Sequence, residues 1–170
     1  EGPDLAITGN FYGPDWKPVC PLKVDGQVVE YDPEYAYPAL CWDEGGDVTV
    51  DVVPRGGLSA WKNYIANCAG IYRSQDQPMI FGADVGGRRG RTGWGLRDDA
   101  LALVAFPDGI DGMTPLELRA WAKAQGWTDF ILADGGRKVN YYDRERGTLI
   151  EGKDPSQNLI LIWLKKEEET

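Results

Sequence analysis

The residue with the clearest chemical potential is Asp134, which follows the apolar run 130–133 and precedes two glycines. The run is typical of a buried strand, so the carboxylate is expected where that strand ends, over a cleft. Glycines at 135 and 136 permit backbone angles that other residues avoid and allow a ligand to approach the main chain. The alternative interpretation is an Asp-Gly-Gly turn whose carboxylate caps its own backbone.

The absence of histidine limits the chemistry that this carboxylate can take part in. The chain has 0 His and 3 Cys among its 170 residues, which excludes Ser-His-Asp and Cys-His catalysis and any zinc site with a histidine ligand. The cysteines Cys20, Cys41 and Cys68 form no CxxC pair, so no metal site is expected. A disulfide between Cys20 and Cys41 and buried free thiols are both compatible with the spacing.

The composition predicts one domain, residues 1–170, with short aromatic strands joined by many turns. The chain contains 22 Gly, 11 Pro, 7 Trp and 8 Tyr and carries a net charge of -9. An acidic protein lacks the broad basic face that nucleic acids and anionic membranes require. With no apolar run of membrane-spanning length, the protein is expected to be soluble. We expect it to be extracytoplasmic if a signal peptide was removed before Glu1 and cytoplasmic otherwise.

Local patterns predict several of the elements that position Asp134. A hairpin is predicted at Asp25-Gly26, between two alternating runs. The continuous apolar run 100–106 predicts a central strand buried on both faces. Thr114, Pro115 and Glu117 form a capping box that begins a helix. Strand, helix and strand in this order imply a right-handed crossover between parallel neighbours, so the predicted class is α+β, with a mixed β-sheet and few helices.

Other segments give weaker expectations. Strands are predicted at 5–8 and 48–53, a short helix or turn and then a strand within 61–72, and a last buried strand at 158–164. A surface excursion is expected at 32–42, a mobile basic loop at 82–95 and a frayed charged tail at 165–169.

The order of several motifs resembles the phosphodiester glycosidase family, which includes the enzyme that uncovers mannose 6-phosphate by removing N-acetylglucosamine from a phosphodiester. The segments are Arg-Thr-Gly-Trp-Gly at 91–95, Gly-Met-Thr-Pro at 112–115, Gly-Trp at 126–127 and Ala-Asp-Gly-Gly at 133–136. The segment 8–12 is weakly similar to the Asn-Gly-Gly-Phe-Phe of the family. This chain departs from the family pattern at 137–139, where Arg-Lys-Val replaces Gly-Ser-Ser.

The resemblance implies a hydrolase that cleaves a sugar–phosphate linkage. Arg91 would bind the phosphate, because a guanidinium contacts two phosphate oxygens at once. Asp134 would act at the anomeric carbon, as nucleophile or as base for water. The family pattern, with the local chemistry, assigns substrate binding to Thr8, Asn10, Thr92, Gly135, Gly136, Arg137 and Lys138. Arg91 could instead pair with a structural acid such as Asp99 or with Asp134.

Two further function classes remain open. A binding module on the same fold would hold a phosphosugar or a nucleotide-like ligand without turnover, which the charged 137–138 pair would explain. A structural protein would use the aromatic segment 31–42 as a contact surface. For the hydrolase, the expected partner is a small or polymer-linked sugar phosphate, in a bacterial or phage setting. Tyr12, Tyr141 and Tyr142 could stack on a sugar or belong to the core.

Overall fold

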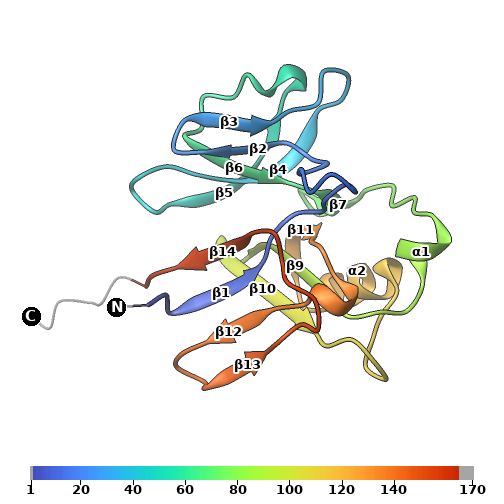
Figure 1. Cartoon of the computed structure of the whole chain (residues 1–170). Coiled ribbons are helices and arrows are strands. Elements are labelled where there is room, and N and C mark those ends of the chain that lie inside the picture. Colours follow the sequence, from blue (N-terminus) through green and yellow to red (C-terminus); the bar gives the residue numbers. More distant parts are fainter. Residues whose placement is uncertain (1, 165–170) are drawn as a thin grey trace, which may run out of the picture.

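The computed structural model describes residues 2–164 of the chain, and the tail predicted at 165–169 lies outside this part. Strands are the dominant regular structure of the described residues and form three antiparallel sheets, of which one lies at the top of Figure 1 and the other two lie together in its lower half. Two α-helices occur in the described residues, and the longer has ten residues.

The upper sheet has the strand order β3-β2-β6-β4-β5. Asp25 and Gly26 both have positive φ, 49° and 80°, and form the predicted hairpin turn between its first two strands. The strands are β2 (Leu22–Val24), β3 (Gln27–Glu30), β4 (Tyr37–Trp42), β5 (Val48–Val53) and β6 (Asn63–Ala66).

The central sheet has the order β10-β9-β11-β7-β8 and carries Asp134 at the end of β11. Glycines in β9 let β11 pack closely on it: a Cβ at Gly93 would lie 2.4 Å from the Phe130 ring, and one at Gly95 would lie 1.9 Å from the Asp129 carbonyl oxygen. The strands are β7 (Cys68–Tyr72), β8 (Gln75–Asp76), β9 (Arg91–Arg97), β10 (Ala100–Phe106) and β11 (Trp127–Leu132).

The third sheet joins the two ends of the chain in the order β13-β12-β1-β14. Its first strand in sequence lies between two strands from the last third of the chain, so the segments around 8–12 and 138–158 are neighbours. The strands are β1 (Leu5–Thr8), β12 (Tyr141–Asp143), β13 (Thr148–Ile150) and β14 (Leu159–Ile162).

Helix α2 (Pro115–Ala124) begins as predicted, with Thr114 and Glu117 making both hydrogen bonds of the capping box. It covers one face of the central sheet through Leu118 and Ala122. The other helical segments are short: α1 (Ala83–Gly86) and two 3-10 turns, η1 (Arg55–Gly57) and η2 (Gly136–Lys138).

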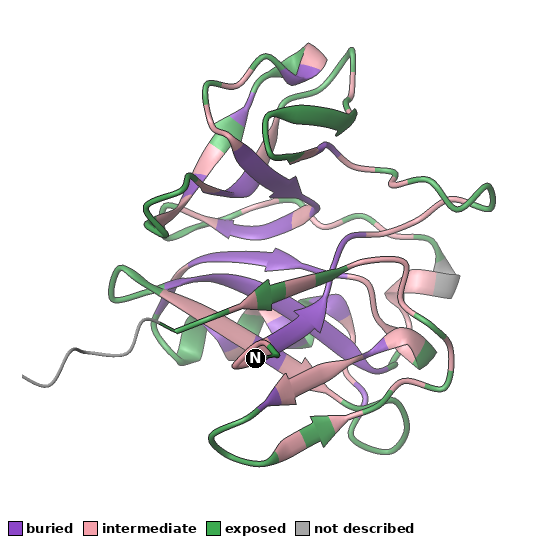
Figure 2. Cartoon of the chain, turned by 60° about the vertical axis from the view of Figure 1, so that its left-hand side comes forward, coloured by how far each residue is buried: buried purple, intermediate pink, exposed green. Residues whose placement is uncertain are grey.

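The main core lies between the upper and central sheets, where Leu40 and Ile65 pack with Trp94 and Ile131. A second core lies between the central sheet and α2. Figure 2 shows the buried stretches running through the middle strands of both sheets, with exposed residues at the loops and edges. Asp134 therefore follows a strand that is buried on both faces.

The predicted α+β class with a mixed sheet is wrong. The strand pairs of the described residues are antiparallel, and the fold is mostly β. Strands β10 and β11 do run in the same direction, but β9 lies between them and pairs with both. The crossover through α2 therefore skips a strand, which a pattern of strand, helix and strand does not reveal.

Other differences between the predicted and the observed elements also arise from the order of strands in the sheets. Strand β10 is an edge strand, not a central one, and β14 at another edge alternates between exposed and half-buried residues. The expected excursion 32–42 includes β4, whose residues 39–41 are buried in the upper sheet. Segment 61–72 forms two strands without a helix, and residue 91 lies in β9, not in a loop.

Candidate functional site

Asp134 lies at the end of β11 in a largely buried position. Its side chain is 16% exposed, its Oδ1 accepts a hydrogen bond from the Gly135 N–H at 2.8 Å, and its Oδ2 lies 3.7 Å from Nζ of Lys138. Burial raises the pKa of Asp134 and outweighs the lowering effects of the Gly135 N–H and Lys138. The group is thus a carboxylate of increased basicity with a cation beside it.

Lys138 connects this carboxylate with the loop after β1. Its Nζ lies 3.4 Å from Oε1 of Gln157 and 5.7 Å from the centroid of the Trp16 ring, within cation–π range. The short 3-10 turn η2 returns the chain over Asp134 and so places position 138 next to position 134. Lys138 is therefore the cation best placed to meet an anionic group near Asp134.

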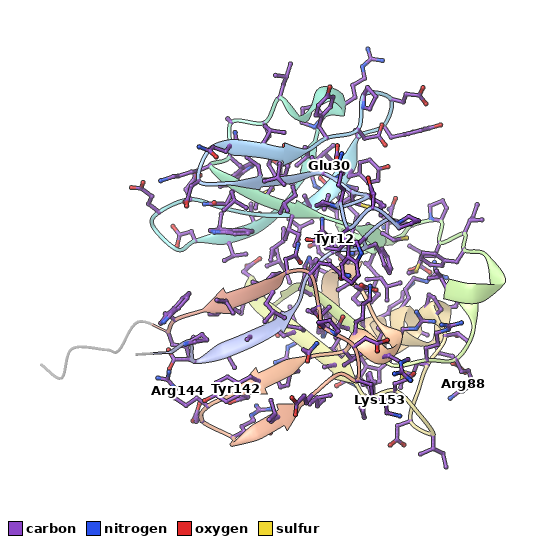
Figure 3. All side chains as sticks on the ribbon, viewed as in Figure 1. Tyr12, Glu30, Arg88, Tyr142, Arg144 and Lys153 are labelled. Atoms are coloured by element: carbon purple, nitrogen blue, oxygen red, sulfur yellow. The ribbon has the colours of Figure 1, made fainter. Side chains whose placement is uncertain are left out.

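An amide network holds the neighbouring wall of the site. Asn158 donates from Nδ2 to the Tyr12 hydroxyl and to Oδ1 of Asn10, both at 2.7 Å, and its Oδ1 accepts the Asn10 N–H at 3.1 Å. Position 9 must be glycine here, because a Cβ would lie 1.4 Å from Oδ1 of Asn158. Tyr12 lies between the upper sheet and the lower strands in Figure 3. Burial raises the pKa of Tyr12 against the lowering effect of the Asn158 hydrogen bond, and the charge of Asp134 adds a smaller increase.

Arg91 is buried, at 2% exposure, and its guanidinium is bound to backbone carbonyls. Nε donates to the Met113 carbonyl at 2.8 Å, and Nη2 donates to the carbonyls of Val85 and Gly87. Burial lowers the pKa of Arg91, with a further contribution from Arg89. Within residues 2–164 the structure has no ion pair between Arg91 and Asp134, so the two predicted catalytic side chains do not meet.

The two threonines that were predicted to bind substrate hold the main chain of the site. Thr92 donates to the Asp134 carbonyl, and Thr8 donates to the Lys138 carbonyl at 2.9 Å while it accepts the Asn140 N–H at 2.8 Å. Both threonines are buried. They fix the segment 134–140 against β9 and β1.

The glycine amides predicted to bind an anion already have acceptors. The Gly135 N–H donates to the Asp134 carboxylate, and the Gly136 N–H donates to the Gly90 carbonyl at 2.7 Å. Arg137 is exposed and forms a two-pronged ion pair with Asp154, at 2.9 and 3.1 Å. The structure thus brings Asp134 and Lys138 together, holds the Asn10 side chain against Asn158 and the Cys20 carbonyl, and leaves Arg91 and Arg137 with protein partners.

Two cavities lie away from this cluster. One, of about 490 Å³, is formed by β12, β13 and the loop 151–156, and the other, of about 830 Å³, lies between β10 and the turn after β12. Neither is lined by Asp134. Tyr142 and Arg144, which line them, are well separated from Tyr12 in Figure 3. In the described part of the chain no three His, Cys, Asp or Glu residues could hold a metal, and no helix could span a membrane.

Sequence reasoning missed Trp16, Gln157 and Asn158. Asn158 is 148 positions from Asn10, and the contact arises because β1 and β14 pair in the third sheet. Trp16 lies in a Gly-Pro-Asp-Trp loop that predicts a turn and gives no sign of its neighbours. No spacing rule links these positions.

Comparison with known proteins finds solved structures with a similar backbone fold. Neither a family model nor a curated protein sequence matches the chain. Among solved structures, the catalytic domain of zebrafish N-acetylglucosamine-1-phosphodiester alpha-N-acetylglucosaminidase, auto-inhibited by its pro-peptide, matches 96% of this chain with a TM-score of 0.72 and 13% identity. A hypothetical protein from Synechocystis matches 94% with a TM-score of 0.67 and 11% identity.

The chain spans only part of these structures, 64% of the zebrafish chain and 50% of the cyanobacterial one. At such identities the likeness concerns the backbone fold and not the chemistry of the site. The protein therefore has a fold distantly related to that of a glycosidase catalytic domain.

Proposed function

We propose that this protein hydrolyses a linkage between a sugar and a phosphate, with Asp134 as the reactive group. The observation that carries the proposal is the Asp134 carboxylate itself, largely buried at a strand end and 3.7 Å from the Lys138 ammonium. A partly desolvated carboxylate beside a cation is costly to maintain and is typical of an active site. The distant likeness to a glycosidase catalytic domain supports the same reaction class.

In this proposal Asp134 activates water. The bond between the anomeric carbon and the phosphate oxygen breaks, and its electron pair leaves with the phosphate. The water oxygen bonds to the anomeric carbon, and its proton passes to the Asp134 carboxylate. The raised pKa of Asp134 suits this role, because a more basic carboxylate is a better proton acceptor. Inversion at the anomeric carbon would distinguish this route from direct attack by Asp134.

The departing phosphate needs a cation to stabilise its charge, and Lys138 is placed to be that cation. Its Nζ is held by the Asp134 carboxylate, the Gln157 amide oxygen and the Trp16 ring, so it is already oriented when the substrate arrives. The phosphate contact predicted for Arg91 stays a prediction. It would require the guanidinium to release carbonyl groups to which it is bound.

A non-catalytic phosphosugar-binding module is the second candidate. It is favoured by the hydrogen bonds that already occupy the Gly135 and Gly136 amides and the Arg91 guanidinium, which leave few donors for a transition state. In such a module Lys138 would bind the phosphate and Asp134 would orient the sugar hydroxyls.

Hydrolysis of a panel of sugar phosphodiesters by wild type, Asp134→Asn and Lys138→Met tests the proposal. Loss of general-base assistance predicts a fall in turnover of about 10²–10⁴-fold for Asp134→Asn. Asp143→Asn is the matched control, because this buried carboxylate lies at the end of β12 and outside the Asp134 cluster. Turnover that survives Asp134→Asn contradicts the mechanism, and binding without turnover in wild type supports the module.

A further inference from the structure

Trp16 is an exposed aromatic residue in a backbone conformation that its side chain disfavours. Its side chain is among the most exposed of the large hydrophobic residues, at 64%, and its φ is 64°, in the left-handed region. A bulky residue rarely adopts this region, and the cost is on the order of 1–3 kcal/mol. Neither burial nor a structural turn requirement explains a tryptophan at this position, since glycine or asparagine would suit the turn better.

The loop that carries Trp16 is closed by its own hydrogen bonds. The Trp16 N–H donates to the Gly13 carbonyl at 3.1 Å, the Gly13 N–H donates to the Lys17 carbonyl at 2.9 Å, and Tyr12 and Pro18 form an isolated bridge. The loop therefore presents the indole on a fixed base. An aromatic ring that is ordered before binding loses little entropy when a ligand stacks on it.

The indole lies over the candidate site. The Lys138 ammonium is 5.7 Å from the ring centroid, and the same ammonium is 3.7 Å from the Asp134 carboxylate. Tyr12, which begins the loop, accepts a hydrogen bond from Asn158 in the adjoining wall. The site thus has one aromatic face and several hydrogen-bonding groups: a carboxylate, an ammonium, a hydroxyl and amides.

We propose that Trp16 is the platform on which the pyranose ring of the substrate stacks, with the phosphate directed toward Lys138. This inference rests on the proposed function, because it assigns the sugar-binding part of the same site. A pyranose combines an apolar C–H face, which fits the indole, with hydroxyl groups, which fit the carboxylate and amide groups nearby. A nucleobase could also stack on the indole but would leave these polar groups without matching hydroxyls.

Calorimetric titration with N-acetylglucosamine 1-phosphate, inorganic phosphate and uridine monophosphate tests the platform. Trp16→Ala is expected to weaken sugar phosphate binding about tenfold, the equivalent of roughly 1.4 kcal/mol. Its affinity for inorganic phosphate is expected to fall less, by no more than about threefold, because Lys138 loses the Trp16 ring but keeps its contacts with Asp134 and Gln157. Trp16→Phe should retain most of the affinity, because it keeps an aromatic face.

Trp163→Ala is the matched control, because Trp163 is similarly exposed, at 56%, and lies just after β14 instead of in the 12–18 loop. It should bind all three probes as wild type does. Both variants remove an exposed ring, and circular dichroism checks that both are folded.

The outcomes distinguish failure of the Trp16 proposal from failure of the proposed hydrolase function. If Trp16→Ala leaves the sugar phosphate affinity and the KM unchanged while Asp134→Asn abolishes turnover, the platform is overturned and the hydrolase stands. If wild type shows no turnover but its sugar phosphate affinity depends on Trp16, the hydrolase fails and the platform stands. The proposal for Trp16 is overturned if Trp16→Ala weakens only the affinity for uridine monophosphate. It is also overturned if wild type does not bind the sugar phosphate.

Discussion

At the scale of single residues, Asp134 is expected to reduce the stability of the fold. Burial raises its pKa in the native state above the value in the unfolded chain. The folded protein then binds this proton more tightly, so stability is lost as the pH rises through the native pKa. At pH 7 the ionised group thus destabilises the native state, which is a common consequence of placing a reactive side chain in a site.

Asp134→Asn should therefore stabilise the protein at neutral pH. We expect a gain of about 0.5–2 kcal/mol at pH 7, which for a domain of this size is an increase of roughly 1–8 °C in Tm. The difference from wild type should vanish below about pH 3.9, where the carboxyl group is protonated in both states. Thermal unfolding at a series of pH values measures this. A variant that is less stable than wild type at pH 7 would show that the Lys138 and Gly135 contacts outweigh burial.

The same residue also illustrates what sequence can predict. The position of Asp134 after a buried strand could be predicted from local information, because an apolar run and two glycines define a strand end without reference to the rest of the chain. Its neighbours could not be, since Trp16 and Asn158 come from the loop after β1 and the loop before β14. A local pattern predicts which side chain follows a strand, whereas the residues that surround that side chain depend on which strands pair.

At the scale of elements, Arg91 joins the start of β9 to two other segments. Its guanidinium binds carbonyls of Val85 and Gly87, in and just after α1, and the carbonyl of Met113, just before α2. The carbonyls of Val85 and Gly87 lie at the end of a short helix, and the Met113 carbonyl also accepts the Arg89 N–H at 3.2 Å. The arginine therefore acts as a bridge between elements that the hydrophobic cores do not connect.

Arg91→Ala is expected to destabilise the fold by about 3 kcal/mol, because it removes the donor from the part-buried carbonyls of Val85 and Gly87. Arg91→Lys should recover only part of this loss, since an ammonium lacks the planar set of donors. Urea unfolding of the three proteins measures the free energies. A contrasting result, in which Arg91→Ala keeps wild-type stability but loses affinity for inorganic phosphate, would assign the guanidinium to the ligand.

Element prediction succeeded where the signal was local and failed where it was not. The turn at Asp25-Gly26 and the cap at Thr114 depend on side chains within a few positions of each other, and both are present in the structure. The position of β9 between β10 and β11 depends instead on Gly93 and Gly95 accepting the close approach of β11. A glycine in a strand indicates close packing but does not identify the partner strand.

At the scale of the whole molecule, the site is formed where the central and third sheets meet. Asp134 follows β11 of the central sheet, whereas Thr8 ends β1 and Asn158 precedes β14 in the third sheet. The Asp134 N–H donates to the Gly9 carbonyl at 3.0 Å, which links the two sheets directly. The first and last parts of the described chain therefore meet beside Asp134, through Gly9 and through the contact of Gln157 with Lys138, so the site depends on the pairing of β1 with β14.

Asn158→Ala tests this dependence, because it removes the hydrogen bonds that Asn158 makes to Asn10 and Tyr12. We expect a loss of about 2–3 kcal/mol in unfolding free energy, from buried polar groups left without partners, and faster hydrogen exchange at the Asn10 amide. Gln157→Ala at the adjacent position removes only the longer contact to Lys138, at 3.4 Å, and should leave this amide protected. Asn158→Asp separates the two roles of the side chain, since a carboxylate of the same size still accepts the Asn10 N–H but cannot donate to Oδ1 of Asn10 or to the Tyr12 hydroxyl. Equal protection of the Asn10 amide in wild type and all three variants would mean that sheet pairing alone holds the wall of the site. Loss of this protection in the two Asn158 variants only would establish the Asn158 side-chain amide as the link between the chain ends.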